Sequence, residues 1–346
     1  MSLSLETRPA AAASTEALLS VEHAVKTFSV RRRSFRRVTI TAVDDVNLHV
    51  GRGEMVGLVG ESGSGKSTLG RAILNLSPLD SGQVRFDGQR IEGLTEREFR
   101  PLRSRLQMVF QNPATSFNPT MTIGQTLVDA MRLLADASAE EKRHRAMLLL
   151  DRMQLDERFA SLYPYEMSGG QLQRVALARA LAPEPEFIFL DEPTAALDMS
   201  IRGQIINLLL DLQRQNHLSF VFVSHDLRVI RYVSDRVVVM YLGQVVETGP
   251  KQQIFETPRH PYTQALLAAT VTGRDARQPR QRRAALRGEA VTGGVPGCKL
   301  YGRCPFALPR CADEPQGLIQ VQPDHWVRCW RTDDIGTTSG PLMPPD

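Results

Sequence analysis

The sequence lacks any apolar run close to the about 18–20 residues that a membrane-spanning helix needs. Its most apolar stretches, Phe187–Leu190 and Phe220–Val223, are short and suit buried parallel strands. The first 19 residues lack a basic start followed by an apolar core, so they predict a disordered tail and not a secretion signal. We therefore expect the protein in the cytoplasm. If it works at a membrane, other chains must cross that membrane.

Cysteine is absent from the first 297 of the 346 residues, and all four cysteines follow a stretch rich in Arg, Gln and Gly at 271–295, which we interpret as a linker. The chain also lacks an internal repeat, so it carries one copy of its main domain. The net charge of +4 is mild, and the basic cluster at 31–37 favours a solvated loop over nucleic-acid or lipid binding. No function is assigned to that cluster.

Strand-like and helix-like segments alternate along the chain, which predicts an α/β fold with a largely parallel sheet. Strands are expected at Leu19–Phe28, Thr39–Val50, Glu54–Val59, Gly82–Phe86, Gln107–Phe110, Phe187–Leu190, Ser219–Val223 and Val237–Tyr241. Helices are expected at Ser67–Leu76, Ile201–Gln215 and Leu227–Val233. Residues 122–182 show mostly helical spacing and predict a helical subdomain inserted into this core.

A phosphate-binding loop is predicted where the expected strand at 54–59 runs into a helix. The pattern G-x-x-x-x-G-K-[ST] is met by Gly60, Glu61, Ser62, Gly63, Ser64, Gly65, Lys66, Ser67 and Thr68. Glycines let backbone N–H groups turn toward phosphates, and the positive end of the following helix points at them. Lys66 adds a charge and the Ser67 hydroxyl can bind Mg²⁺. The alternative is a glycine-rich turn without a ligand.

Two carboxylates follow the apolar strand Phe187–Leu190, which is typical of a Walker B site. Asp191 is expected to hold Mg²⁺, and Glu192 to act as the general base for the attacking water. A single acid in this place is often only a helix cap. A pair downstream of a phosphate loop favours ATP hydrolysis.

The segment Met167-Ser168-Gly169-Gly170-Gln171 resembles the signature of ABC ATPases, with Met in place of the usual Leu. The resemblance covers about residues 20–250 and implies a P-loop NTPase fold of the ABC type. It implies that the signature completes the ATP site of a second, related ATPase subunit. The plain alternative for Ser168 is a helix N-cap.

The same resemblance implies further roles around ATP and Mg²⁺. It makes Gln111 a Mg²⁺ ligand together with Ser67 and Asp191, and His225 a sensor of the γ-phosphate. Asp198, in Ala195-Ala196-Leu197-Asp198, resembles the D-loop aspartate. Phe28 is placed like an aromatic that stacks on adenine, although a lone aromatic is equally often a core residue.

Further stretches resemble the oligopeptide and dipeptide permease ATPases: Gln111–Pro119, Met121–Gly124, His260-Pro261-Tyr262-Thr263 and Ala265–Leu267. With the cysteines, this resemblance runs to about residue 332. It implies an importer whose two transmembrane permease subunits and extracytoplasmic substrate-binding protein are separate chains, with this chain on the cytoplasmic face of the membrane. An importer of nickel or another small solute, and a soluble ABC ATPase, are the alternatives.

The resulting division of the chain is a tail at 1–19, an ABC ATPase domain at 20–270 with its helical subdomain at about 112–182, and a linker at 271–295. A small cysteine-rich domain at 296–334 and a tail at 335–346 follow.

The cysteines form the pattern C-x5-C-x6-C-x17-C, made by Cys298, Cys304, Cys311 and Cys329. Disulfides are disfavoured in a reducing cytoplasm, which favours metal ligation. The family resemblance implies a 4Fe–4S cluster on these four residues. Zinc, with His325 as a possible fourth ligand, and unliganded thiols are the alternatives.

Overall fold

The structure is a computed structural model of the chain. It describes residues 17–31, 37–132, 134, 137–270, 286, 288 and 296–332. The chain forms two compact units. Unit 1 holds the residues up to Val21, Leu48–Met55 and Gln83–Val221, and unit 2 holds Glu22–Asn47, Val56–Gly82 and the residues from Phe222 onward. Most of the expected tails, linker and basic cluster lie outside the described residues.

Several strands contribute residues to both units. A four-stranded sheet has the order β2-β1-β4-β5. Its strands are β1 (Leu19–Arg31), β2 (Arg37–Val50), β4 (Ser81–Phe86) and β5 (Gln89–Arg90). Strand β3 (Met55–Val59) and strand β8 (Ser219–Val223) are buried throughout and also divide between the units. Strands β1, β2, β3, β4 and β8 confirm predicted segments, whereas the two-residue strand β5 was not predicted.

In unit 1, β6 (Leu106–Val109) and β7 (Phe187–Asp191) form a parallel pair in which Val109 lies opposite Leu190. Strand β7 is buried at every residue, as expected for a strand covered on both faces. Because the strands are parallel, the loops that follow them leave the same edge of the sheet. This edge carries Gln111 and Glu192.

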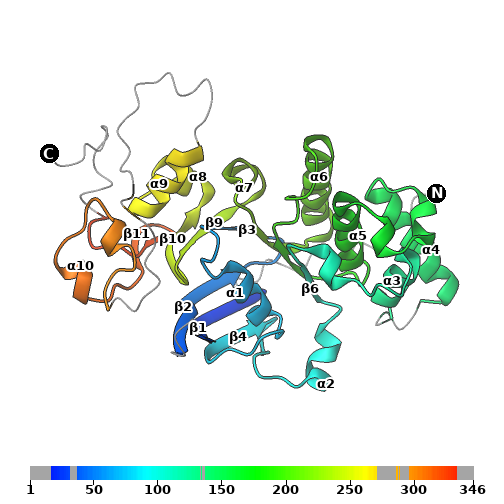
Figure 1. Ribbon diagram of the computed structural model, residues 1–346, viewed down its shortest axis with the longest axis horizontal. Helices are drawn as coiled ribbons and strands as arrows, with labels where there is room; N and C mark the ends of the chain where they lie inside the picture. Colours follow the sequence, from blue (N-terminus) through cyan, green and yellow to red (C-terminus); the bar gives the residue numbers. More distant parts are fainter. Residues whose placement is uncertain are drawn as a thin grey trace. The chain divides into compact units, whose positions relative to one another are not determined.

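The predicted helical block of unit 1 contains three packed helices, α3 (Ile123–Ala130), α4 (Ala139–Arg152) and α5 (Gly169–Leu181) (Figure 1). Each begins at a hydroxyl N-cap, and those of α3 and α5 form capping boxes with a glutamine three residues later. Helix α2 (Glu96–Phe99) and helix α6 (Met199–Asn216) complete the α-helices described in this unit. Four short 3₁₀ helices cover Arg100–Leu102, Pro113–Ser116, Glu157–Ser161 and Pro164–Glu166.

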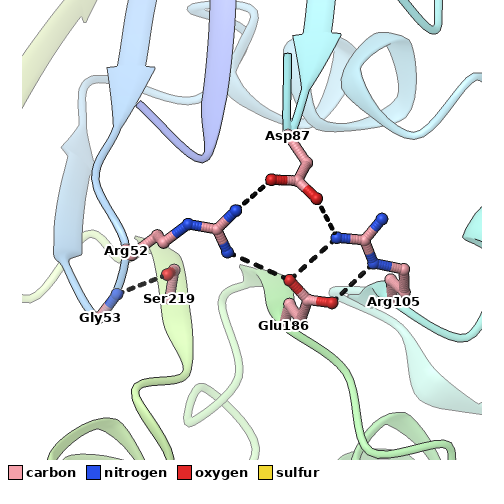
Figure 2. Close-up of polar contacts among 6 residues, drawn as sticks. All are labelled: Arg52, Gly53, Asp87, Arg105, Glu186 and Ser219. Atoms are coloured by element: carbon pink, nitrogen blue, oxygen red, sulfur yellow. Dashed lines mark hydrogen bonds and ion pairs between the residues drawn. The ribbon is translucent and has the colours of Figure 1, made fainter. Parts of the chain in front are cut away.

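Four charged side chains of unit 1 form a closed ring of ion pairs (Figure 2). Arg52 pairs with Asp87 and, at 3.3 Å, with Glu186. Arg105 contacts Asp87 at 2.5 Å and Glu186 at 2.6 Å. Glu186 immediately precedes β7, so the ring lies at the strand end opposite Asp191. It therefore serves the fold and not the candidate site.

In unit 2, β3 pairs in parallel with β9 (Arg236–Tyr241), with Val59 opposite Val239. From β9 the sheet continues antiparallel through β10 (Gln244–Pro250) and β12 (His325–Val327) to β11 (Ile319–Gln322). The sequence patterns did not predict these last three strands. The expected cysteine-rich domain at 296–334 stays a prediction, but its two strands pair with the sheet through β10.

The helices of unit 2 begin with α1 (Lys66–Ile73) and α7 (Leu227–Val233), both predicted. Helices α8 (Lys251–Glu256) and α9 (Pro261–Thr270) follow β10, and the cysteine segment adds a 3₁₀ turn at Tyr301–Arg303 and α10 (Arg310–Asp313). In the part of the chain that the structure describes, no helix is both long and apolar enough to span a bilayer.

Candidate functional site

The predicted phosphate loop connects the buried strand β3 to helix α1 in unit 2. Two of its glycines are required by close backbone contacts. A Cβ on Gly60 would lie 2.2 Å from the Met240 carbonyl oxygen, and one on Gly65 would lie 2.0 Å from the Ala42 carbonyl oxygen. Gly65 also has a φ of 100° at the start of α1. Only glycine fits these two positions, so the loop can take no other residue where it turns.

Lys66 points back into its own loop. Its Nζ donates to the carbonyl oxygens of Gly60 and Glu61, both at 2.8 Å, and to the Ser64 hydroxyl at 3.1 Å. The side chain is buried, and the first turn of α1 contains no acidic residue. A buried ammonium group at the N-terminus of a helix suits a polyanionic ligand. The residues present therefore fit a triphosphate.

Phe28 is exposed on β1, with 42% of its surface accessible. The ammonium group of Lys26 lies 5.5 Å from the centre of its ring. An aromatic this exposed is not a core residue, which leaves its face open to a planar ligand. The stacking role stays a prediction.

The two predicted catalytic carboxylates differ in environment. Asp191 ends β7 and is buried, with 4% of its surface exposed. Glu192 is partly exposed and has a φ of 50°, a left-handed conformation that is uncommon outside glycine. The Gln111 side-chain amide donates to the Glu192 carboxylate at 3.2 Å. The structure thus brings together two of the predicted site residues, which lie 81 positions apart.

The signature segment begins helix α5. Ser168 accepts from the Gln171 backbone N–H at 3.3 Å, and Gln171 Oε1 accepts from the Ser168 N–H at 2.8 Å. Met167 is buried, whereas Ser168 and Gly169 are exposed. A Cβ on Gly169 would meet nothing within 4 Å. The N-cap interpretation is therefore confirmed, and the cap leaves the serine–glycine turn accessible.

Asp198 and His225 lie at the starts of two other helices. Asp198 accepts from the Ile201 backbone N–H at 3.1 Å and caps α6. His225 is exposed and immediately precedes Asp226, which caps α7. The cap gives Asp198 a structural role whether or not it also contacts a partner.

The predicted site residues divide between the two units. Unit 2 holds Phe28, Gly60–Thr68 and His225. Unit 1 holds Gln111, Ser168, Gly169, Gly170, Gln171, Asp191, Glu192 and Asp198. The sequence patterns gave no role to three residues of unit 2, namely Glu61, which lies in the loop, and Tyr262 and Arg303, which bond to it. Glu61 occupies an unconstrained position of the motif, so no pattern pointed to it.

The expectation of an iron–sulfur cluster on Cys298, Cys304, Cys311 and Cys329 is wrong. Among the described residues, which include all four cysteines, no group of three or more His, Cys, Asp or Glu side chains is arranged to hold a metal ion. Burial raises the thiol pKa of Cys304 to about 11 and that of Cys329 to about 12, and it also raises the pKa of Cys298. In the metal-free chain these three thiols are therefore protonated near neutral pH. The absence of such a group among the described residues also speaks against zinc, and His325, the possible fourth ligand, is hydrogen-bonded to Glu247.

Two family models match the chain. The model for ABC transporters matches residues 43–195, and the model for the C-terminal region of oligopeptide/dipeptide transporters matches residues 246–311. The first covers the phosphate loop, the signature and both carboxylates.

Similar proteins cover nearly the whole chain. A putative peptide import ATP-binding protein of Brucella ovis is 42% identical over 317 residues, spanning 91% of this chain and 98% of the relative. The oligopeptide transport ATP-binding protein AppF of Bacillus subtilis is 41% identical over 323 residues, spanning 92% and 98%.

Solved structures show the same fold. The dimeric ATP-binding cassette MJ0796, bound to ADP and Pi in a post-hydrolysis state, is 33% identical with a TM-score of 0.61 and covers 67% of this chain and 98% of its own. The protein cbiO1 of Clostridium perfringens is 28% identical with a TM-score of 0.58, covering 70% and 92%. With the phosphate loop, the paired carboxylates and the exposed signature, these matches show that the chain belongs to the family of ABC transporter ATPases.

Proposed function

We propose that this ATPase energises the import of oligopeptides or dipeptides across the cytoplasmic membrane. The observation that carries the cargo class is the C-terminal region at 246–311, which matches the oligopeptide/dipeptide transporter model. Relatives over 40% identical across nine-tenths of the chain are named as a putative peptide import and an oligopeptide transport ATP-binding protein. An importer of nickel or another small solute is the alternative within transport.

The phosphate loop would bind the ATP phosphates through the backbone of Gly60–Gly65 and the ammonium group of Lys66. That group leaves the loop carbonyls, which it contacts at 2.8 Å, and turns to the phosphate oxygens. Phe28 would stack on adenine.

Ser67, Gln111 and Asp191 would hold Mg²⁺, which neutralises charge on the phosphates when bound. Hydroxyl, amide and carboxylate oxygens are the donors that this ion takes. Glu192 would accept a proton from the attacking water, and His225 would contact the γ-phosphate. The hydrogen bond from Gln111 orients the Glu192 carboxylate for that transfer.

A second ATPase subunit would meet the signature turn. Ser168 and Gly169 are exposed and rigidly capped, so the turn can donate to a phosphate bound on another chain. Gly170, Gln171 and Asp198 adjoin the same surface. The dimeric state of MJ0796 supports such a pair. Two permease subunits and an extracytoplasmic substrate-binding protein would complete the importer, with this chain on the cytoplasmic face.

The assembled transporter, reconstituted in liposomes with its binding protein, tests this function. Di- to pentapeptides should stimulate ATP turnover, whereas Ni²⁺ should not. The same assembly carrying Lys66→Ala should show neither basal nor stimulated turnover, because a charge-assisted phosphate contact is lost. Stimulation by Ni²⁺ alone would replace the peptide by the metal as cargo. Full turnover by the isolated chain, without a gain on assembly, would favour a soluble ABC ATPase.

A further inference from the structure

The chain that follows β10 reaches back to the phosphate loop at Glu61, a residue that the motif leaves unconstrained. The Glu61 backbone N–H donates to the Tyr262 hydroxyl at 2.9 Å. Arg303 Nη1 lies 3.3 and 3.4 Å from the two Glu61 carboxylate oxygens and 3.2 Å from the Tyr241 hydroxyl. Tyr262 and Arg303 both lie within the residues matched by the peptide-transporter C-terminal model.

The contact from Tyr262 fixes one peptide unit of the loop. The Gly60 carbonyl and the Glu61 N–H belong to the same planar peptide group and point in opposite directions. The carbonyl accepts from Lys66 Nζ at 2.8 Å, and the N–H donates to Tyr262 at 2.9 Å. The peptide is therefore held from both sides, by the phosphate-binding lysine and by Tyr262.

Tyr262 is held in place by buried packing and by hydrogen bonds to the residues that precede it. It is 1% exposed and packs against Tyr241, with ring centres 4.6 Å apart. The residues just before it are bonded to the buried carboxylate of Glu247, which accepts from the Arg259 N–H at 2.7 Å and the His260 N–H at 3.0 Å. Such packing fixes the hydroxyl in space, so the loop adapts to Tyr262 and not the reverse.

A third contact of the C-terminal segment, made by Lys299, supports the loop indirectly at Ser64. Lys299 Nζ donates to the Leu242 carbonyl at 2.7 Å and pairs with Asp44 at 2.6 Å. The neighbouring Gly243 N–H donates to the Ser64 carbonyl of the loop at 3.0 Å. The C-terminal segment thus reaches the loop at two points, directly at Glu61 and through the β9–β10 turn at Ser64.

We infer that Tyr262 and Arg303 are positioning residues for ATP binding, which hold Glu61 and through it the shape of the phosphate loop. The inference rests on the proposed role of residues Gly60–Thr68 in binding the ATP phosphates. It gives the peptide-transporter C-terminal region a task at the nucleotide site. Displacement of this region from Glu61 weakens the hold on nucleotide and leaves the hydrolytic residues unchanged.

The test measures equilibrium binding of the fluorescent analogue mant-ATP to the full chain, and KM and kcat of the assembled ATPase. Tyr262→Phe removes only the hydroxyl and should raise Kd and KM about 3- to 10-fold, the range expected for one lost hydrogen bond, with kcat changed less than about 2-fold. Arg303→Met should raise them about 2- to 5-fold, because the ion pair is partly exposed. Arg303→Lys should recover part of this loss.

Matched controls come from the same segment. Tyr301→Phe and Arg310→Met remove a phenolic hydroxyl and a guanidinium group from exposed positions, where the Arg310 guanidinium packs on Trp330 and not on the loop. Both should bind mant-ATP like the original chain. The double variant Glu61→Gln/Arg303→Met should bind mant-ATP as tightly as whichever single variant has the higher Kd. The two effects should not add, because both substitutions remove the same contact.

The outcomes separate this inference from the proposed function. Normal Kd and KM in Tyr262→Phe and Arg303→Met, with Lys66→Ala still defective, overturn the positioning role and leave the ATP site intact. Equal losses in Arg310→Met also overturn it, because they indicate general destabilisation, which the unfolding midpoint of each variant measures. Failure of the original chain to bind mant-ATP overturns the proposed site itself.

Discussion

The Gln111 amide donates to the Glu192 carboxylate across 3.2 Å, although the two residues lie on separate loops. The loops come together because β6 and β7 run in parallel and end at one sheet edge. Glu192 meets Gln111 in a left-handed backbone conformation, with a φ of 50°. Such strain persists where the surrounding structure enforces it, and it is concentrated at functional sites.

Glu192→Gln should stop hydrolysis while nucleotide still binds. The amide keeps the size of the side chain but cannot accept a proton from water. Turnover should fall about 10²- to 10⁴-fold, the contribution typical of a general base, with the Kd for mant-ATP within about 2-fold of the original. Phosphate release and mant-ATP titration measure the two quantities. Undiminished turnover would assign the base to another residue.

Gln111→Ala should lower kcat by roughly 10-fold through loss of the contact that orients Glu192. Residues that act as a unit have non-additive effects. At saturating Mg²⁺, which compensates for the proposed ligand role of Gln111, the double variant Gln111→Ala/Glu192→Gln should therefore be no slower than Glu192→Gln alone. A further multiplicative loss in the double variant would show that Gln111 acts independently of the base.

The turn between β3 and α1, the strand that ends at Asp191 and the capped start of α5 could be predicted from sequence because each is a local pattern with a fixed physical cause. Gly60 and Gly65 are dictated by carbonyls of Met240 and Ala42, yet the motif marks them without those partners. The strands around Leu190 and Val223 could be predicted because burial on both faces requires continuous apolar residues.

Long-range polar contacts could not be predicted in this way. The bond between Glu61 and Tyr262 joins residues 201 positions apart, and neither is unusual in its own neighbourhood. Strand β12 contains only His325–Val327, too few residues to show an alternation. The cysteine spacing misled because sequence alone does not show how the four thiols are arranged, and among the described residues they form no group that could hold a metal ion.

Gly169→Asp should separate folding from function. A Cβ at Gly169 meets no atom within 4 Å, and an acidic residue in the first turn of α5 is favourable to the helix. The unfolding midpoint and mant-ATP binding by the isolated chain should therefore be unchanged. Turnover of the assembled pair should drop about 100-fold, because a negative charge would face the γ-phosphate held by the partner.

Gly169→Ala is the matched control, since it adds a methyl group to the same open space without charge, and it should keep most of the turnover. If Gly169→Asp hydrolyses ATP normally in the assembly, the signature does not meet a phosphate.

Arg105→Met should destabilise unit 1 by about 1–2 kcal/mol. Arg105 bonds both Asp87 and Glu186, and its loss removes both of these pairs from the ring (Figure 2). The expected loss of stability is modest because the Arg105 side chain is 32% exposed and solvent screens its ion pairs. Arg52→Met, at a more exposed side chain, should have a smaller effect. Urea unfolding measures the loss of stability in each variant. A loss in Arg52→Met equal to or larger than that in Arg105→Met would contradict the larger role given to Arg105.

The same ring of ion pairs predicts that the protein loses folding stability at low pH. Hydrogen bonding and charge from Arg105, aided by Arg52, hold the pKa of Asp87 below its usual range. A lowered folded pKa contributes stability above the unfolded value of about 3.9, and that stability is lost as the pH falls through the folded pKa. Stability lost below about pH 4 should therefore be smaller in Asp87→Asn than in the original chain, as measured by unfolding midpoints at pH 5 and pH 3.

Acidification should also destabilise the segment that holds Tyr262. This effect should begin at a higher pH than the effect at Asp87. Burial lowers the pKa of His260 to about 4, against the opposing charge of Glu247. Its neutral Nδ1 accepts from the Tyr262 N–H at 3.1 Å, a bond that a protonated ring cannot make. Between about pH 6.5 and 4 the unfolded chain binds a proton that the folded chain does not. Stability present above pH 6.5 is therefore lost progressively on acidification, by roughly 1–3 kcal/mol.

His260→Asn isolates this effect, because its amide oxygen can still accept from Tyr262 but does not titrate. Its stability should fall less between pH 7 and pH 5 than that of the original chain, whereas His144→Asn, at an exposed position, should show the original slope. If Tyr262 positions the phosphate loop, the Kd for mant-ATP should rise over the same pH range in the original chain and stay flatter in His260→Asn. Parallel pH profiles in all three proteins would show that His260 does not carry the acid sensitivity of this segment.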